Sequence, residues 1–238
     1  MKPALAKACV VLAAVLLIPA VAMAVPTLQL WSDSAVYDPA TETWVTKSNP
    51  FTLQVLGARS PASVQVISGV TLYVSVPEDF NPLGFVTIQG LPSAPPTPDR
   101  IPYTYYRLGL GGMGFYEYGT PPGLPSHDAF PAYYRGVALE DLMVGTAGET
   151  VPDYTPDDTG AGTGDIQRYW VSWYGFPYVH FDLTGIGYDT SNPLDAGKVW
   201  PRFAPFSHDL TALPEPATLF LLAGGLAGLV GIRRRLLK

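Results

Sequence analysis

Val70-Thr71-Leu72-Tyr73-Val74-Ser75-Val76 places an aliphatic side chain at every second position. A two-residue period of this kind is typical of a β-strand with one buried face. The same period recurs between turn residues, at positions 28–30, 51–55, 64–66, 169–174 and 178–183. Because residues 25–212 show no clean helical period, we expect an all-β fold, an antiparallel β-sandwich-like exported domain.

The segments between these strands are rich in turn residues. The run Phe51–Pro77 is predicted to be a hairpin, joined through Arg59-Ser60-Pro61 and Ser68-Gly69. Two longer stretches are predicted to be loops, namely Leu91–Pro102 with its five prolines and the Asp- and Gly-rich Thr150–Asp165. We expect a single domain with loop insertions, since no repeat period is visible.

The N-terminal residues have the layout of a secretory signal peptide. Two lysines precede the apolar run 8–18, and Ala22 and Ala24 form an A-x-A cleavage site. Signal peptidase is expected to remove residues 1–24. The single cysteine, Cys9, lies in that segment, so the exported chain is expected to hold neither a thiol nor a disulfide.

The C-terminal residues 213–238 combine three features. Pro214-Glu215-Pro216 is followed by the uncharged segment 217–232 and then by a basic tail, residues 233–238, that opens with Arg233, Arg234 and Arg235. A helix over 217–232 would be about 24 Å long, close to the ~30 Å hydrocarbon core of a bilayer. The positive-inside rule keeps the arginines cytoplasmic and the preceding domain outside. We expect a transmembrane helix that fixes this topology.

These C-terminal features, in this order, resemble the PEP-CTERM sorting signal. The resemblance implies that exosortase, a membrane-embedded protease, recognises and removes the tail. It also implies an exported protein, anchored in the inner membrane as a precursor and then placed on the cell envelope surface or outside the cell. In this interpretation Pro214, Glu215 and Pro216 keep the segment before the membrane extended, because proline continues neither a helix nor a ladder.

The exported region between Val25 and Leu213 is acidic. It contains 8 Lys and Arg residues against 19 Asp and Glu residues, so its net charge is near −11. Such a domain repels phosphate backbones, and nucleic acid is therefore excluded as a partner. The charge favours solubility and would suit cation-bridged contact with an anionic matrix.

The exported region is also similar to the choice-of-anchor N family of surface domains. The motifs that carry this resemblance are rich in aromatic residues, Pro and Gly, and they are Pro26–Leu30, Glu42–Val45, Tyr118–Pro122, Phe130–Tyr134, Val179–Leu183 and Phe203–Asp209. The family resemblance implies a surface domain with interchangeable C-terminal anchors. It implies no activity, catalytic residue or ligand.

Aromatic residues alternate in the predicted strand 169–174. Trp170, Ser172 and Tyr174 would share one face, while Trp173 would lie on the other with Tyr169 and Val171. An exposed aromatic face is how many sugar-binding modules stack pyranose rings. Trp170 and Trp173 are therefore weak candidates for ligand stacking, and burial in the core is the favoured alternative.

Four aspartates cluster in the predicted loop before that strand, namely Asp153, Asp157, Asp158 and Asp165. Carboxylates in an extracellular loop would bind calcium weakly, at millimolar concentrations. The spacing fits neither the EF-hand pattern nor the repeated glycine-aspartate motif of β-helices, so a solvated acidic loop is the favoured interpretation.

Histidine and aspartate recur together at three places. His180 and Asp182 would share one face of a strand, and the pairs His127-Asp128 and His208-Asp209 lie elsewhere in the chain. If all three pairs converged, they would form a divalent metal site. Chance pairing in an acidic chain is favoured over that hypothesis, and no metal is expected at these residues.

Three matches to functional motifs are interpreted as coincidence. Residues 109–114 read G-x-G-x-x-G, but the following residues cannot form the helix that a dinucleotide site needs. Ser126-His127-Asp128 and Ser207-His208-Asp209 name the members of a hydrolase triad, but consecutive side chains in an extended segment point apart. Turn capping is the favoured role of both serines.

The sequence therefore predicts a non-enzymatic protein of the cell surface or extracellular matrix, with a structural or adhesive role. Its expected partners are signal peptidase and exosortase during processing and extracellular polysaccharide afterwards. A carbohydrate-binding module of the matrix is the first alternative. A secreted hydrolase is the second, and it predicts that His127→Ala or His208→Ala abolishes turnover. No cofactor is expected other than weakly held calcium.

Overall fold

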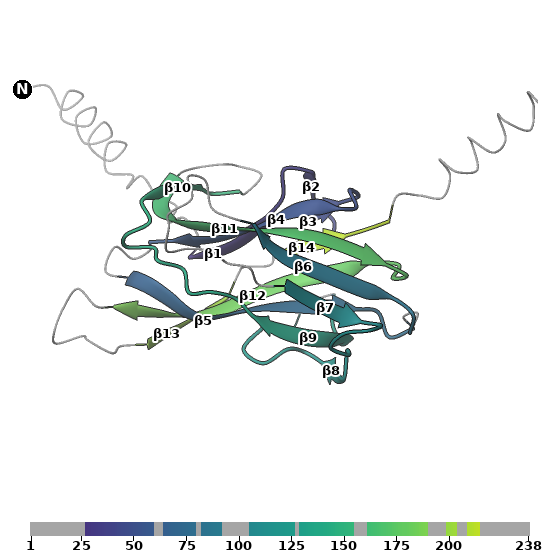
Figure 1. Ribbon diagram of the computed structural model, residues 1–238. Helices are drawn as coiled ribbons and strands as arrows, with labels where there is room; N and C mark the ends of the chain where they lie inside the picture. Colours follow the sequence, from purple (N-terminus) through teal and green to yellow (C-terminus); the bar gives the residue numbers. More distant parts are fainter. Residues whose placement is uncertain are drawn as a thin grey trace, which may run out of the picture.

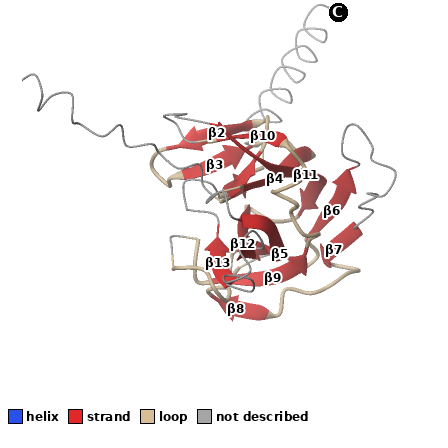
Figure 2. Cartoon of the chain, turned by 90° about the vertical axis from the view of Figure 1, so that its left-hand side faces the viewer, coloured by secondary structure: helices blue, strands red, loops and turns tan. Residues whose placement is uncertain are grey.

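The computed structural model describes residues 27–59, 64–79, 82–91, 105–126, 129–154, 161–189, 199–203 and 209–214. These residues contain strands and connecting loops but no helix (Figures 1 and 2). In chain order the strands are β1 (Leu28–Trp31), β2 (Ala35–Asp38), β3 (Thr43–Thr46), β4 (Phe51–Ala58), β5 (Val64–Val76), β6 (Phe85–Leu91), β7 (Tyr105–Gly109), β8 (Glu117–Gly119), β9 (Ala132–Ala138), β10 (Glu149–Pro152), β11 (Ala161–Tyr174), β12 (Val179–Asp189), β13 (Val199–Phe203) and β14 (Leu210–Ala212).

The strands form two sheets. A six-stranded sheet has the order β1-β4-β11-β6-β7, with β10 paired to the start of β11. An eight-stranded sheet has the order β2-β3-β14-β12-β5-β9-β8, with β13 paired to β12. The pairing of β14 with β3 is parallel, and the other pairings between the described strands are antiparallel. The expectation of an all-β, largely antiparallel fold is confirmed.

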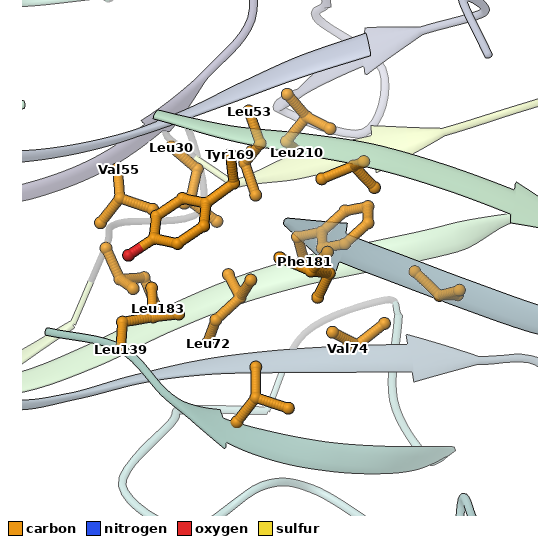
Figure 3. Close-up of a cluster of buried hydrophobic side chains, with 14 of the residues drawn as sticks. Leu30, Leu53, Val55, Leu72, Val74, Leu139, Tyr169, Phe181, Leu183 and Leu210 are labelled. Carbon is orange, nitrogen blue, oxygen red and sulfur yellow. The ribbon is translucent and has the colours of Figure 1, made fainter. Parts of the chain in front are cut away.

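A shared hydrophobic core lies between the two sheets. Leu53, Val55 and Tyr169 reach into it from the six-stranded sheet. Phe181 and Leu183 meet them from the eight-stranded sheet (Figure 3). These are the alternating apolar positions of their strands, so the two-residue period correctly marked the buried faces.

The predicted hairpin over Phe51–Pro77 is wrong, because β4 and β5 belong to different sheets. The chain passes from one sheet to the other between β4 and β5. The apolar faces of these two strands then pack against the same core from opposite sides. The expected turn at Ser68-Gly69 lies inside β5. There Gly69 has a φ of 60°, and the pairing register with β12 shifts between Thr184 and Ile186. This irregularity is a bulge in a continuing strand.

The predicted loop over Thr150–Asp165 is also partly wrong. Its ends are paired strands, because β10 runs antiparallel to the first residues of β11. Gly164 lies where β11 pairs with the end of β4, and a Cβ there would come within 1.9 Å of the Gly57 carbonyl oxygen. The glycines that suggested a loop therefore permit close packing of backbones. The predicted loop over Leu91–Pro102 lies outside the described residues after Leu91.

Both expected hydrophobic segments, the signal peptide over 1–24 and the helix over 217–232, lie outside the described residues. Within the part of the chain that the structure describes, no helix has the length and hydropathy needed to cross a membrane.

Candidate functional site

The outer face of the eight-stranded sheet carries a buried polar cluster. On β12, Phe181 and Leu183 point into the core, so the alternating His180 and Asp182 point away from it. His180 pairs with Thr211 of β14. Continuing this antiparallel register by two residues places Asp209 opposite Asp182. Two cross-strand pairs thus bring His180, Asp182, Asp209 and Thr211 to one patch of the sheet.

The three ionisable side chains of this cluster lie in close contact. Candidate ligand atoms of His180, Asp182 and Asp209 all lie within 4.8 Å of one another, and all three residues are buried. His180 Nε2 is 3.4 Å from Asp182 Oδ1. The other ring nitrogen, Nδ1, shares a hydrogen bond of 2.7 Å with Thr211 Oγ1. Thr211 therefore orients the imidazole so that Nε2 faces the carboxylates.

The cluster brings two carboxyl groups together at buried positions. Burial raises the pKa of Asp209 well above its usual value, and the facing Asp182 carboxyl raises it further. Two carboxylates in such contact resist ionising together. A shared proton or a bound cation would relieve this repulsion.

A pocket of about 620 Å³ opens beside the cluster. His180, Asp209 and Thr211 form part of its wall, and the turn between β2 and β3 contributes Asp38 and Glu42. No lysine or arginine is among the described residues that line it, so the pocket is acidic. It therefore favours cations or hydroxyl-rich molecules over anions.

A segment before β9 covers the cluster. The ring of Phe130 stands edge-on to the imidazole of His180, with ring centroids 6.3 Å apart. Ser126 and Ala129 of the same segment line the pocket. This cover explains why His180 is only 2% exposed although it points away from the core.

One more buried polar group adjoins the cluster. Ser75 of β5 lies directly opposite His180 in the sheet register, on the same face. The residue is fully buried, and its hydroxyl has no hydrogen-bond partner among the described residues. A buried hydroxyl without a partner is unusual in a native fold, and a bound water or ligand is the ordinary explanation.

The outer face of the six-stranded sheet is different, because it exposes aromatic rings. Trp170 and Tyr174 of β11 are 43% and 64% exposed, and Tyr105 of β7 is 59% exposed. The register places Gln89 of β6 between Trp170 and Tyr105. Strand spacings then put Trp170 about 14 Å from Tyr174 along β11 and about 10 Å from Tyr105 across the sheet.

Polar and charged groups complete this aromatic face. Arg107 lies over the ring of Phe85, 4.0 Å from its centroid, and that ring is 5.9 Å from the ring of Tyr174. The hydroxyls of Thr87 and Ser172 are hydrogen bonded at 2.6 Å between the rings. The face is therefore a flat surface of rings with hydrogen-bonding groups between them.

The two tryptophans proposed for ligand stacking lie on opposite faces of β11. Trp170 is on the exposed face, but Trp173 is 4% exposed and packs edge-on against Phe51 in the core. Trp173 cannot stack on a ligand without unfolding the sheet, so that part of the prediction is wrong. The alternation of side chains in β11 is the physical reason, since positions 170 and 173 point to opposite faces.

The acidic loop does not expose its described carboxylates. Asp153 and Asp165 are both buried, and Asp165 Oδ2 accepts a 2.7 Å hydrogen bond from the backbone N–H of Met143. Neither belongs to the ligand cluster that the described residues form. Asp157 and Asp158 lie outside the described residues. Calcium binding by these four residues stays a prediction.

The structure also locates the motif matches. Residues 109–114 form a tight turn after β7, in which Gly109 N–H donates to the Met113 carbonyl at 2.7 Å. The strand β8 follows instead of a helix, so this turn lacks the helix N-terminus of a dinucleotide site. Ser126 is described at the pocket, whereas His127, Asp128, Ser207 and His208 lie outside the described residues.

Sequence reasoning found part of the buried cluster and missed the rest. It placed His180 and Asp182 on one face and named Asp209 as a partner. Thr211 and Ser75 were missed, because serine and threonine are ordinary residues of strands. The two-residue spacing of Asp209 and Thr211 could have placed both on one face of a strand, but not beside His180 and Asp182.

Comparison with known proteins identifies the C-terminal segment. Residues 212–235 match the PEP-CTERM protein-sorting motif. No curated protein matches the chain. One solved structure, described as "AvmM Catalyzes Macrocyclization in Alchivemycin A Biosynthesis", is 9% identical with a TM-score of 0.32, over 80% of this chain and 90% of that chain. A likeness this distant carries no argument about fold or function.

The sorting motif establishes the class of protein. The chain is an exported, exosortase-sorted protein, anchored in the membrane before processing and then located on the cell surface. Pro214 is the last described residue, whereas Glu215, Pro216 and Arg233–Arg235 lie outside the described residues, as do Ala22 and Ala24 of the signal peptidase site. Their individual roles stay predictions.

Proposed function

We propose that this protein is a non-catalytic, adhesive component of the cell surface or matrix, and that it contacts carbohydrate through the aromatic face of the six-stranded sheet. The observation that carries the proposal is the exposure of Trp170, Tyr174 and Tyr105 on one face. Solvent-exposed aromatic rings on a rigid sheet present large apolar surfaces at fixed spacing, at little cost in conformational entropy.

The chemistry of this face suits a sugar polymer better than a folded protein. Rings offer apolar surfaces to pyranose faces, and the Thr87 and Ser172 hydroxyls and the Gln89 amide lie between them in register. A chain of sugars running along β11 would span the ~14 Å between Trp170 and Tyr174. Arg107, on the edge strand β7, supplies a positive charge for an acidic sugar.

Export supports this assignment. A protein released at the cell surface meets the polysaccharides that surround the cell, and the acidic exported region is suited to a hydrated matrix. The resemblance to the choice-of-anchor N family stays a prediction, and it would assign no ligand. Removal of the tail by exosortase would decide whether the domain acts in the matrix or on the membrane.

Affinity electrophoresis tests the proposal. The full chain, purified in detergent, is run through gels with and without exopolysaccharide isolated from its host. We expect the polysaccharide to retard the wild type, and we expect the affinity to fall about tenfold or more in Trp170→Ala. Aromatic side chains that become buried on binding dominate binding energies. Tyr116→Ala is the matched control, because Tyr116 is 78% exposed but lies between β7 and β8. Equal retardation of the wild type and Trp170→Ala would reject this binding face.

Intact mass spectrometry tests the expected processing. Protein from the surface and medium fractions of the host should begin at Val25 and end near Pro214–Pro216. A species that retains residues 233–238 in the membrane fraction would instead mean that the domain stays anchored. Carbohydrate binding would then have to be measured at the membrane.

A further inference from the structure

We propose that His180, Asp182 and Asp209 hold a divalent transition-metal cation of the zinc class beside the acidic pocket, whose wall includes His180 and Asp209. The proposal concerns the outer face of the eight-stranded sheet and is independent of the carbohydrate surface on the other sheet. It starts from ligand geometry, since three candidate ligand atoms on two neighbouring strands lie within 4.8 Å of one another.

The separation between two of the ligand atoms fits a tetrahedral ion. Zinc binds imidazole nitrogen and carboxylate oxygen at about 2.1 Å. With both bonds near that length, the 3.4 Å between His180 Nε2 and Asp182 Oδ1 corresponds to an angle of about 108° at the metal. A carboxylate oxygen of Asp209 lies within 4.8 Å of both of these atoms and would be the third protein ligand.

The surroundings of His180 are those of a metal ligand. Its Nδ1 is held at 2.7 Å by Thr211 Oγ1, which leaves Nε2 directed at the carboxylates. Histidine ligands in metal sites almost always have their second ring nitrogen fixed in this way. The edge-on contact with Phe130 restricts the ring further.

A second observation points to a ligand at the same place. The fully buried Ser75 hydroxyl, which has no partner among the described residues, lies opposite His180 on the same face of the sheet. A water bound to the cation would supply that partner. The pocket leaves room for such a water, or for an oxygen of a larger molecule, at the fourth position.

The ligand set selects the class of metal. Calcium takes six to eight oxygen ligands and rarely accepts imidazole, whereas zinc and its neighbours bind imidazole with carboxylate in small sites. One nitrogen and two carboxylates also leave the centre electrically neutral. The cation thereby offsets the repulsion between two buried carboxylates.

Zinc titration tests the site. The full chain is purified in detergent, stripped with a chelator and loaded with zinc chloride alone. We expect one zinc per chain, and a loss of affinity of more than about 100-fold in Asp182→Asn and in Asp209→Asn. Thr211→Val should lose about tenfold, as expected for a group that only positions a ligand. Asp38→Asn, a change in the same pocket, should lose less than about fivefold, because exposed charges are screened.

Two further measurements test the site without relying on variants that could fail to fold. Cobalt(II) loaded into the wild-type chain should give the intense visible absorption of a four-coordinate nitrogen and oxygen site. Trp170→Ala should bind zinc like the wild type, so failure of the carbohydrate proposal remains distinguishable from failure of this one. Substoichiometric zinc, six-coordinate cobalt, or equal affinity in wild type and Asp209→Asn would overturn the site. The two carboxyls would then share a proton instead.

Discussion

The outward side chains of the two sheets differ in exposure to solvent. On β11 of the six-stranded sheet, the outward Trp170 and Tyr174 remain exposed to solvent. On β12 of the eight-stranded sheet, the outward His180 and Asp182 are buried beneath the segment that carries Phe130. One outer face is thus an open aromatic surface, and the other is a covered polar site beside a pocket.

This contrast shows what alternation in a strand determines. A two-residue period decides which side chains share a face, and both strands obey it. It does not decide whether a face is open, because the covering segment comes from another part of the chain. Exposed rings offer a surface for binding large molecules, whereas buried polar groups need internal partners.

The largest expected effect compares two tryptophans in one strand. Trp173→Ala should lower the free energy of unfolding by about 3–5 kcal/mol, because it empties the core position against Phe51. Trp170→Ala should change it by less than about 1 kcal/mol, because that ring lies on the open face. Urea unfolding of both variants measures the difference. Similar losses in the two would mean that the aromatic face is covered in solution.

A second comparison uses one threonine from each outer face. Thr211→Val removes the hydrogen bond to the buried ring of His180, and we expect a loss of about 1–3 kcal/mol in chelator-treated protein. Thr87→Val removes its bond to Ser172 on the open face, where water replaces the partner, and we expect less than about 1 kcal/mol. Thermal unfolding of the two variants measures which one loses more stability. A larger loss in Thr87→Val would contradict the assignment of open and covered faces.

Much of the fold is predictable from local pattern. The alternating positions of Leu53 and Val55, of Leu72 and Val74, and of Phe181 all face the core. The pattern did not reveal that β4 and β5 separate into different sheets, since either arrangement buries the same residues. Partner choice depends on long-range pairing, such as β11 with β4 and β12 with β5.

The buried cluster was predictable only in part, for a related reason. His180 and Asp182 are two residues apart, so their shared face follows from the strand period. The approach of Asp209 depends on the register of β14 against β12, which no local signal specifies. The burial of the cluster depends on the segment around Phe130, which is remote in sequence.

The smallest effect concerns Tyr169, which faces the core between the two outer faces. Burial raises its pKa above the usual value of 10, with smaller contributions from Glu140, Tyr106 and Asp165. The folded protein therefore keeps this proton at pH values where the unfolded chain loses it. The stability contributed is complete below about pH 10 and is lost as pH rises toward the folded-state pKa.

Tyr169→Phe isolates this contribution. The variant loses the 2.7 Å hydrogen bond to Gln167 Oε1, so at pH 8 it should be about 1 kcal/mol less stable than the wild type. Above pH 10 the wild type should lose up to about 1.4 kcal/mol per pH unit more than the variant. Urea unfolding between pH 8 and pH 11 should therefore show the two stabilities converging. Parallel curves would mean that Tyr169 is reached by water, and that the core between the open and the covered face is less closed than the packing indicates.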